Sequence, residues 1–390
     1  MSRADSISLL QQLVAFDTTS HLSNLALIDF IVDYLKGFGV ESQRVFSENK
    51  SKANLYATIG PKDIPGVMLS GHTDVVPVKG QSWDTNPFTV VEKDGALFGR
   101  GTADMKGFIA VVLSRVPQMV EADLKTPIHL AFSYDEEIGC VGVRRLLHMM
   151  EGLPVKPAMC IIGEPTEMSV GVAHKGKIAA RVKVRGVESH SSLPQNGVNA
   201  IEYAAELIAY IRRYARQLAQ KGPFDSSFET PYSTLQTGVI QGGSAVNIVP
   251  NSCEFDFEIR NIPLQNIEEL FHKVEAFARD ELQPTMRSEH KQSGITIERL
   301  SSYPGLLTPA NAEIVRFVKK LANQDKVGTI AFGTEGGLFS ETLGIPTVVC
   351  GPGSIVQAHK PNEYIRVPQL RRAEQMIDRL ISSLSIDENA

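Results

Sequence analysis

The sequence of 390 residues has few cysteines, and their spacing excludes the roles that cysteine clusters usually play. The four lie far apart and form no C-x-x-C pair, at Cys140, Cys160, Cys253 and Cys350. A disulfide framework or a cysteine-based zinc site would show closely spaced pairs. We therefore expect buried free thiols in a reducing compartment. A metal ion in this protein would be held by histidine and carboxylate side chains.

Long hydrophobic runs and a strong excess of one charge are also missing. No apolar run approaches the roughly 18–20 residues that span a bilayer. The first 20 residues alternate polar and apolar positions at helical spacing and contain no signal-peptide core, so we expect a cytoplasmic protein. A net charge of −5 gives no reason to expect nucleic acid or an anionic membrane as a partner.

The hydrophobic pattern divides the chain into a discontinuous α/β domain and an inserted α+β domain. Residues 1–176 and 303–390 alternate helical patterns with short apolar strands, which favours a mixed sheet sandwiched by helices. Residues 177–302 instead contain strands of alternating polarity and two long helices in the order βαββαβ, typical of a ferredoxin-like unit. We expect helices over 5–15, 24–37, 106–121, 197–219, 266–282, 309–323 and 368–384.

Polar side chains follow several of the apolar strands. The stretch MLSGHTDVVP (68–77) runs from a buried-strand pattern into a histidine and a carboxylate, and two further strands run into DEE (135–137) and GEP (163–165). In α/β sheets, functional groups lie just beyond the strand ends. The candidate residues of this kind are His72, Asp74, Asp104, Glu136, Glu137, Glu164 and His359.

Each candidate alone also has a structural explanation. His72 could be a hydrogen-bonded histidine at a strand end, Glu136 and Glu137 a solvated charge pair, and His359 a loop histidine. Together, however, several acids at one rim would repel one another, and a cation would remove that cost. Two histidines and three carboxylates can hold two divalent ions if one carboxylate bridges, and such ligands suit Zn²⁺ or Co²⁺ better than Ca²⁺ or Mg²⁺.

Five motifs resemble, in order and spacing, those of the dinuclear-zinc aminoacylase and carboxypeptidase (M20-type) family. They are GHTDVVP (71–77), GRGTADMKG (99–107), DEEIG (135–139), GEPT (163–166) and HKPNEY (359–364). The resemblance spans the whole chain. It implies a metal-dependent hydrolase of linear amides, with 1–176 and 303–390 as the metal-binding catalytic domain and 177–302 as an inserted lid and dimerisation domain.

The resemblance also implies a set of metal ligands. His72 and Glu164 would bind one Zn²⁺, and Glu137 and His359 would bind the other. Asp104 would bridge the two ions. Co²⁺ is an alternative metal for the same ligands.

Catalytic and substrate-binding roles follow from the same resemblance. Glu136 would be the general base that deprotonates the bridging water and passes the proton to the leaving amine, while Asp74 would orient the first histidine. From the inserted domain, His190 in GVESHSS would stabilise the oxyanion, and it would do so in the partner subunit of a homodimer. Asn247 and Arg260 would hold the carbonyl and the carboxylate of a small N-acyl amino acid.

Other stretches resemble most the acetylornithine deacetylase branch of that family, as found in proteobacteria. They are AHKGK (173–177), GVNAIE (197–202), TPYSTLQTG (230–238) and GPGSIVQAHKPNEY (351–364). This resemblance implies hydrolysis of N²-acetyl-L-ornithine to L-ornithine and acetate in arginine biosynthesis. Glu335, in a segment that varies between branches, could pair with the δ-ammonium of ornithine, although a helix-capping role explains it equally well.

Two other enzymatic readings of the same scaffold stay open, namely a succinyl-diaminopimelate desuccinylase and a broader N-acyl amino-acid deacylase. A non-enzymatic paralogue would be expected to lack the base or a ligand, and here all those positions are intact. His129 lies within an apolar strand, and we expect it to be a hydrogen-bonded core histidine with no catalytic role.

Overall fold

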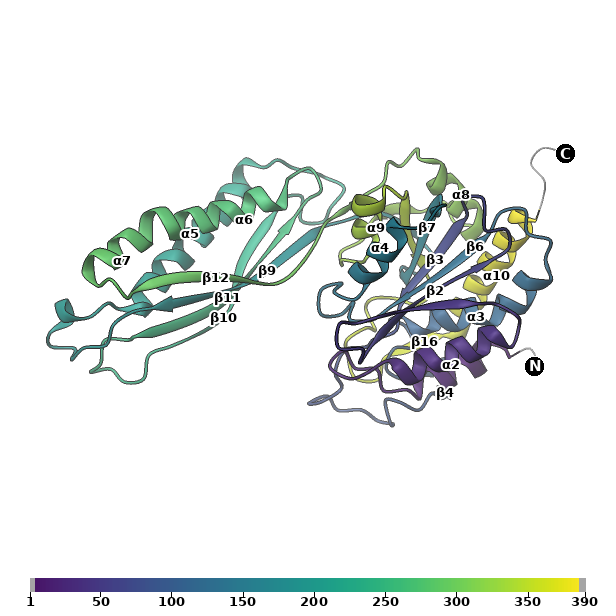
Figure 1. Cartoon of the computed structure of the whole chain (residues 1–390), viewed down its shortest axis with the longest axis horizontal. Coiled ribbons are helices and arrows are strands. Elements are labelled where there is room, and N and C mark those ends of the chain that lie inside the picture. Colours follow the sequence, from purple (N-terminus) through teal and green to yellow (C-terminus); the bar gives the residue numbers. More distant parts are fainter. Residues whose placement is uncertain (1–3, 386–390) are drawn as a thin grey trace. The chain divides into compact units, whose positions relative to one another are not determined.

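The computed structural model describes residues 4–385, which form two compact units (Figure 1). The second unit comprises His174–Gly305 and the short segment Ala331–Gly333, and the first contains the remaining residues. The segment Ala331–Gly333 belongs with the inserted unit because Gly333 packs closely on Tyr303. A Cβ atom at Gly333 would lie 2.3 Å from the Tyr303 ring.

The first unit is built on a mixed nine-stranded sheet, which confirms the predicted fold class. The strand order is β1-β2-β6-β3-β7-β15-β8-β13, with β14 paired to β8. The strands are β1 (Ser42–Phe46), β2 (Ala53–Ile59), β3 (Val67–His72), β6 (Ile128–Ser133), β7 (Met159–Pro165), β8 (Val170–His174), β13 (Leu306–Leu307), β14 (Val327–Thr329) and β15 (Thr347–Gly351). The neighbouring strands β6, β3, β7 and β15 run parallel, so their carboxyl ends lie at the same edge of the sheet.

Helices cover both faces of this sheet. They are α1 (Ser6–Val14), α2 (Leu25–Lys36), α3 (Lys106–Glu121), α4 (Val143–Glu151), α8 (Glu313–Ala322), α9 (Gly336–Leu343) and α10 (Val367–Leu384). On one face α3 contacts α1, α10, β3 and β7, while α4 and α9 contact each other on the opposite side (Figure 1). The close approach of α3 depends on Gly163, where a Cβ atom would lie 2.0 Å from the ring of Phe108.

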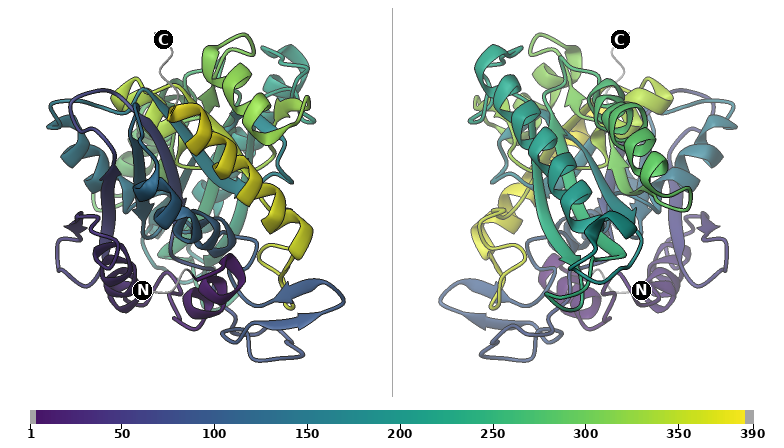
Figure 2. Two further views of the ribbon diagram at one scale, coloured as in Figure 1. Left: turned by 90° about the vertical axis from the view of Figure 1, so that its right-hand side faces the viewer. Right: turned by 90° about the vertical axis from the view of Figure 1, so that its left-hand side faces the viewer.

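A small separate sheet joins two distant segments of the first unit. It contains β4 (Val91–Lys93), β5 (Ala96–Phe98) and β16 (Tyr364–Arg366) in the order β16-β5-β4. Figure 2 shows the β4–β5 hairpin reaching away from the main sheet. Strand β5 lies shortly before Asp104 in the chain, and β16 lies shortly after His359. Because these two strands pair, the segments that carry Asp104 and His359 are held next to each other.

The second unit has the predicted βαββαβ order. Its elements are β9 (Gly176–Arg185), α5 (Ala200–Lys221), β10 (Thr234–Gly242), β11 (Ser252–Asn261), α6 (Ile267–Ala276), α7 (Gln283–Glu289) and β12 (Gly294–Tyr303). The antiparallel sheet has the order β10-β11-β9-β12, and the helices lie on one face of it (Figures 1 and 2). The helix expected over 266–282 is instead α6 followed by a π-helical turn, Phe277–Leu282, that leads into α7.

Two further expectations concern the whole chain. The four cysteines are free and buried, as predicted. Across residues 4–385, no helix combines the length and the apolar character needed to cross a bilayer.

Candidate active site

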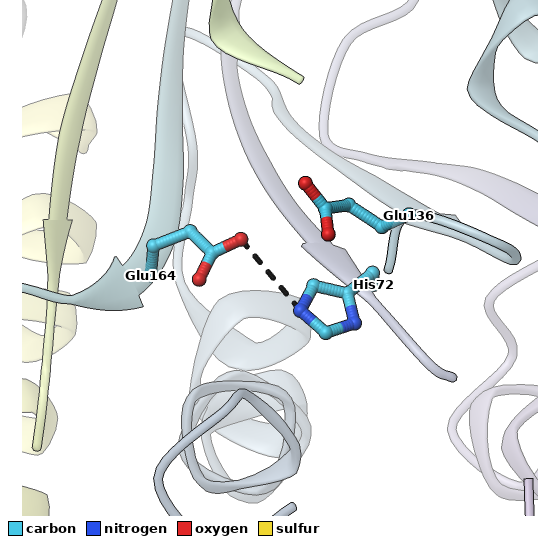
Figure 3. Close-up of side chains that lie close together, drawn as sticks. All are labelled: His72, Glu136 and Glu164. Atoms are coloured by element: carbon cyan, nitrogen blue, oxygen red, sulfur yellow. Dashed lines mark ion pairs between the residues drawn. The ribbon is translucent and has the colours of Figure 1, made fainter. Parts of the chain in front are cut away.

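The carboxyl ends of the four parallel strands deliver the candidate residues to one edge of the sheet. His72 is the last residue of β3, and Glu136 and Glu137 follow the end of β6. Glu164 lies in the last two residues of β7, and the chain that leaves β15 leads to His359. Figure 3 shows His72, Glu136 and Glu164 turned toward one another. Parallel neighbours thus bring together residues that are far apart in the sequence.

Asp104 lies between the two imidazole rings. Its Oδ1 atom is 3.0 Å from Nε2 of His72, and its Oδ2 atom is 3.2 Å from Nε2 of His359. A second carboxylate meets each ring, since Glu164 Oε1 is 3.6 Å from His72 Nε2 and Glu137 Oε2 is 3.0 Å from His359 Nε2. The cluster therefore consists of two half-sites that share Asp104, and each half-site contains one imidazole and one further carboxylate.

This donor set contains candidate cation ligands and is consistent with a dinuclear site. Ligand atoms of His72, Asp104 and Glu137 lie within 4.8 Å of one another, and so do those of His72, Glu136 and Glu164. Within residues 4–385, the buried Oε1 atom of Glu137 has no hydrogen-bond partner. An unpaired carboxylate oxygen is costly to bury, and a cation beside it removes that cost.

The buried carboxyl groups at this edge have strongly shifted pKa values. Burial raises the pKa of Glu136 and Glu164 well above the usual range, and the neighbouring carboxylates add to the effect. Burial also raises the pKa of Glu137 to about 7. Burial acts in the same direction on Asp104, but its hydrogen bonds with His359 and His72 lower its pKa instead. Such crowding of acids is typical of sites that bind cations or transfer protons.

The two histidines respond to the same carboxylates. Burial disfavours a charge on His72, yet hydrogen bonds with Asp104 and Asp74 raise its pKa well above the usual value. Hydrogen bonds with Asp104 and Glu137 raise the pKa of His359 to about 10. The carboxylates therefore favour the protonated form of both imidazoles. Metal ions would displace these protons, so metal binding must depend on pH.

Asp74 contacts His72 and the backbone of the loop that carries Glu136 and Glu137. Nδ1 of His72 lies 2.9 Å from the Asp74 carbonyl oxygen and 3.5 Å from its Oδ1 atom. This contact leaves Nε2 of His72 as the nitrogen that faces the carboxylates. The Asp74 carboxylate also accepts the backbone N–H groups of Glu136 (3.0 Å) and Glu137 (3.3 Å). Asp74 thus fixes the imidazole chiefly through its carbonyl oxygen and the loop after β6 through its carboxylate.

Glu363 is a residue of this site whose role the sequence did not reveal. Its carboxylate is 1% exposed and accepts four hydrogen bonds, two of them from the backbone N–H groups of Ala103 (2.9 Å) and Asp104 (3.0 Å). The other two come from Arg100 Nη1 (2.8 Å) and Gly101 N (3.0 Å). The only signal in the sequence was its place in HKPNEY, four residues after His359.

Glu335 is buried at the start of α9, with 2% of its surface exposed. Burial raises its pKa to about 7, and its charge in turn raises the pKa of Glu136. Among the described residues, its Oε1 atom has no hydrogen-bond partner. Glu335 therefore lies close enough to Glu136 to shift its pKa, and the Oε1 atom of Glu335 can still accept a hydrogen bond.

The remaining three predicted residues belong to the second unit. His190 and Asn247 are exposed on adjacent segments, since His190 forms a bridge with Ile248 and the Ser191 N–H donates to the Asn247 carbonyl (3.1 Å). Arg260 lies on β11, separately from that pair, and its Nε and Nη2 atoms donate to the carboxylate of Glu258 at 3.0 and 3.4 Å.

Comparison with known proteins yields one family and consistent structural neighbours. The sequence profile of peptidase family M20/M25/M40 matches residues 68–383. The chain is 37% identical to an acetylornithine deacetylase of Shigella sonnei (strain Ss046) over 362 residues, which cover 92% of this chain and 91% of that protein.

Two solved structures with the same fold are a metallo-carboxypeptidase and a tripeptidase. A metallo-carboxypeptidase of the M20 family from Sulfolobus solfataricus matches with a TM-score of 0.77 and 17% identity, over 98% of this chain and all of that one. A tripeptidase from Staphylococcus aureus matches with a TM-score of 0.75 and 21% identity, over 99% of both chains.

Proposed function

Because the chain belongs to peptidase family M20/M25/M40, we propose that it is a metal-dependent amidohydrolase that removes the acetyl group from N²-acetyl-L-ornithine. The products are L-ornithine and acetate, and the reaction is a step of arginine biosynthesis. The similarity to the Shigella acetylornithine deacetylase, along nearly the whole length of both proteins, supports this substrate. The observation that carries the chemistry is Asp104, which presents one oxygen to each of two histidines.

Two cations per chain are proposed, with Zn²⁺ as the metal and Co²⁺ as a possible replacement. His72 and Glu164 hold one ion, Glu137 and His359 hold the other, and Asp104 contacts both. Imidazole and carboxylate ligands suit these metals. When bound, such ions polarise the amide carbonyl and make water acidic enough to attack near neutral pH.

Glu136 is the proposed general base. Its carboxylate lies beside His72 and Glu164, within the group whose ligand atoms are no more than 4.8 Å apart, so an attacking water near the ligands lies within its reach. Burial raises the pKa of Glu136 well above the usual range, which helps the carboxylate take a proton from the attacking water and hold it until the C–N bond breaks. Delivery of that proton to the leaving nitrogen completes the hydrolysis.

Substrate binding is assigned to the second unit and to Glu335. Arg260 donates to Glu258 through Nε and Nη2, and its guanidinium group is the proposed partner of the substrate carboxylate. Asn247 holds the acyl carbonyl, and His190 donates to the oxygen that becomes negatively charged during the attack. The unpartnered Oε1 atom of Glu335 is the proposed acceptor for the δ-ammonium of ornithine.

Two features of the working enzyme belong to the same proposal. The exposed His190 completes the site of a partner subunit, which makes the active form a homodimer. The enzyme is proposed to act in the cytoplasm, and the similarity to the Shigella enzyme supports this location.

A substrate panel tests the proposed specificity. The zinc-loaded protein is assayed with N²-acetyl-L-ornithine, succinyl-diaminopimelate and N-acetyl-L-methionine, and kcat/KM is compared. The proposal expects acetylornithine to give the highest value. Preference for succinyl-diaminopimelate would indicate a desuccinylase, and similar values for all three would indicate a broad deacylase. Either result would overturn the substrate assignment.

A further inference from the structure

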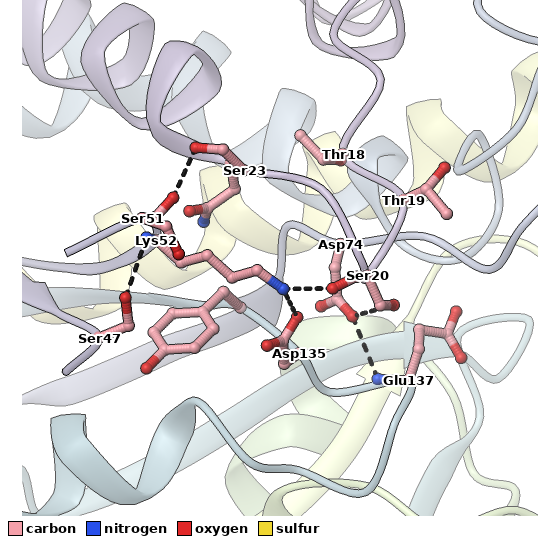
Figure 4. A network of polar contacts seen from close by, with 12 residues as sticks. Thr18, Thr19, Ser20, Ser23, Ser47, Ser51, Lys52, Asp74, Asp135 and Glu137 are labelled. Carbon is pink, nitrogen blue, oxygen red and sulfur yellow. Dashed lines mark hydrogen bonds and ion pairs between the residues drawn. The ribbon is translucent and has the colours of Figure 1, made fainter. Parts of the chain in front are cut away.

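Lys52 is a partly buried cation that joins two loops beside the proposed active site. It directly precedes β2, and its Nζ atom donates to Asp135 Oδ1 (2.5 Å) and to the backbone carbonyl of Ser20 (Figure 4). The side chains of Lys52 and Asp135 are only 13% and 10% exposed. Because water reaches this pair only in part, separating the two charges costs more than separating an exposed pair.

Asp135, the carboxylate partner of Lys52, lies next in sequence to the proposed general base, Glu136, and close to the proposed metal ligand Glu137. Asp135 immediately precedes Glu136 and Glu137. Its φ angle of 54° lies in the left-handed region, which is uncommon for residues with a side chain, although Asp adopts it more readily than most. The bond from Lys52 holds the Asp135 side chain at the point where the chain turns into Glu136.

Ser20, the second partner of Lys52, is connected to Glu136 and Glu137 through hydrogen bonds of Asp74. Ser20 Oγ donates to Asp74 Oδ2 at 2.8 Å, and the Asp74 carboxylate accepts the N–H groups of Glu136 and Glu137. Figure 4 shows Asp74 beside Ser20 and Asp135, with Lys52 reaching between the two loops. Lys52 therefore acts on residues 136 and 137 both through the chain and through Asp74.

We propose that Lys52 is a positioning residue: it sets the loop of residues 135–137 so that Glu136 reaches the attacking water and Glu137 reaches its metal. This inference rests on the proposed metal-binding role of the cluster. Small errors in the placement of a base or a ligand greatly reduce catalysis and metal affinity. The effect of Lys52 is thus expected on metal affinity and kcat, with KM nearly unchanged.

Four single variants test this role. Lys52→Met removes the ion pair, Lys52→Arg keeps its charge, and Asp135→Asn keeps the shape of the partner. Arg115→Met is the matched control, because Arg115 is 15% exposed and forms a comparable ion pair with Glu374. Each metal-free protein is titrated with Co²⁺ and followed by visible absorption, thermal unfolding is measured, and kcat and KM are determined with acetylornithine.

Lys52→Met is expected to weaken Co²⁺ binding about tenfold or more and to lower kcat by a similar factor. Lys52→Arg should recover most of both quantities, and Arg115→Met should change neither. Unchanged Co²⁺ binding in Lys52→Met would overturn the inference. An equal loss in Arg115→Met would also overturn it, since the effect would then follow general stability.

The double variant Lys52→Met/Asp135→Asn leaves no unpaired charge at this contact and shows whether the two residues act as one unit. If the pair acts as one unit, the double variant loses no more Co²⁺ affinity than the worse single variant. Strictly additive losses would contradict the inference. The Co²⁺ titration does not depend on the substrate, so wild-type protein that binds Co²⁺ but leaves acetylornithine intact would refute the proposed substrate and leave the role of Lys52 standing.

Discussion

The buried carboxylate of Glu363 accepts the backbone N–H of Asp104 at 3.0 Å. The residue that bridges the two half-sites is thus held by the segment that also carries His359. Arg100 balances the charge of Glu363 at 2.8 Å and is itself 1% exposed. Glu363 therefore acts on both half-sites through the loop that carries Asp104.

Glu363→Gln should weaken zinc binding by about 10- to 100-fold. Each carboxylate oxygen of Glu363 accepts two hydrogen bonds, and an amide has only one acceptor oxygen. Two of the four donors would therefore lose their acceptor, and Arg100 would lose its counter-charge. Glu374→Gln is the matched control, because Glu374 is a buried acid in the same unit that pairs with Arg115 and Arg371. Chelator competition measures the affinity of both variants. Equal zinc affinity in the two would contradict the assigned role.

Glu136→Gln should keep its metal and lose turnover. The amide cannot take a proton from water, so kcat should fall by about 10²–10⁴-fold, while the proposed ligands are unchanged. Metal analysis and single-turnover assays on the same preparation separate the two effects. Turnover close to that of the wild type would exclude Glu136 as the base.

Glu335→Gln tests the proposed contact with the ornithine side chain. If Glu335 pairs with the δ-ammonium, kcat/KM for acetylornithine should fall by about tenfold or more, as expected for a charged hydrogen bond, while that for N-acetyl-L-methionine changes little. Equal losses with both substrates would instead indicate a structural role at the start of α9.

His129 should make the fold sensitive to acid. Burial lowers its pKa from 6.5 to about 4, so the unfolded chain binds more protons than the folded chain between these values. The free energy of unfolding should therefore fall as the pH drops from about 6.5 to about 4, by up to about 3 kcal/mol. Urea unfolding at pH 7 and pH 4.5 measures this. His129→Gln should lose less stability over that range than the wild type, and an equal loss would contradict the prediction.

The sequence predicted those parts of the fold that depend on local pattern. The apolar run of β3 and the acidic ends of β6 and β7 were recognisable because buried parallel strands are continuous hydrophobic segments. The short helices α4 and α9, of nine and eight residues, give too few turns for a clear periodic pattern. The π-helical turn Phe277–Leu282 has no sequence signal distinct from that of a helix.

The supporting residues of the candidate site were missed for a different reason. Lys52, Ser20 and Glu363 are single polar residues whose partners lie far along the chain, at separations of 32 to 263 residues. No spacing rule connects such positions. His129 was expected to be hydrogen-bonded, and its Nδ1 does lie 2.9 Å from the Tyr56 hydroxyl, but in the described part of the chain its buried Nε2 has no partner.

A crystal structure of the zinc-loaded protein, with anomalous scattering data at the zinc edge, tests the central claim most directly. The account predicts two zinc ions per chain, one bound by His72 and the other by His359, each contacting a different oxygen of Asp104. A single ion, or two ions that do not share Asp104, would contradict it.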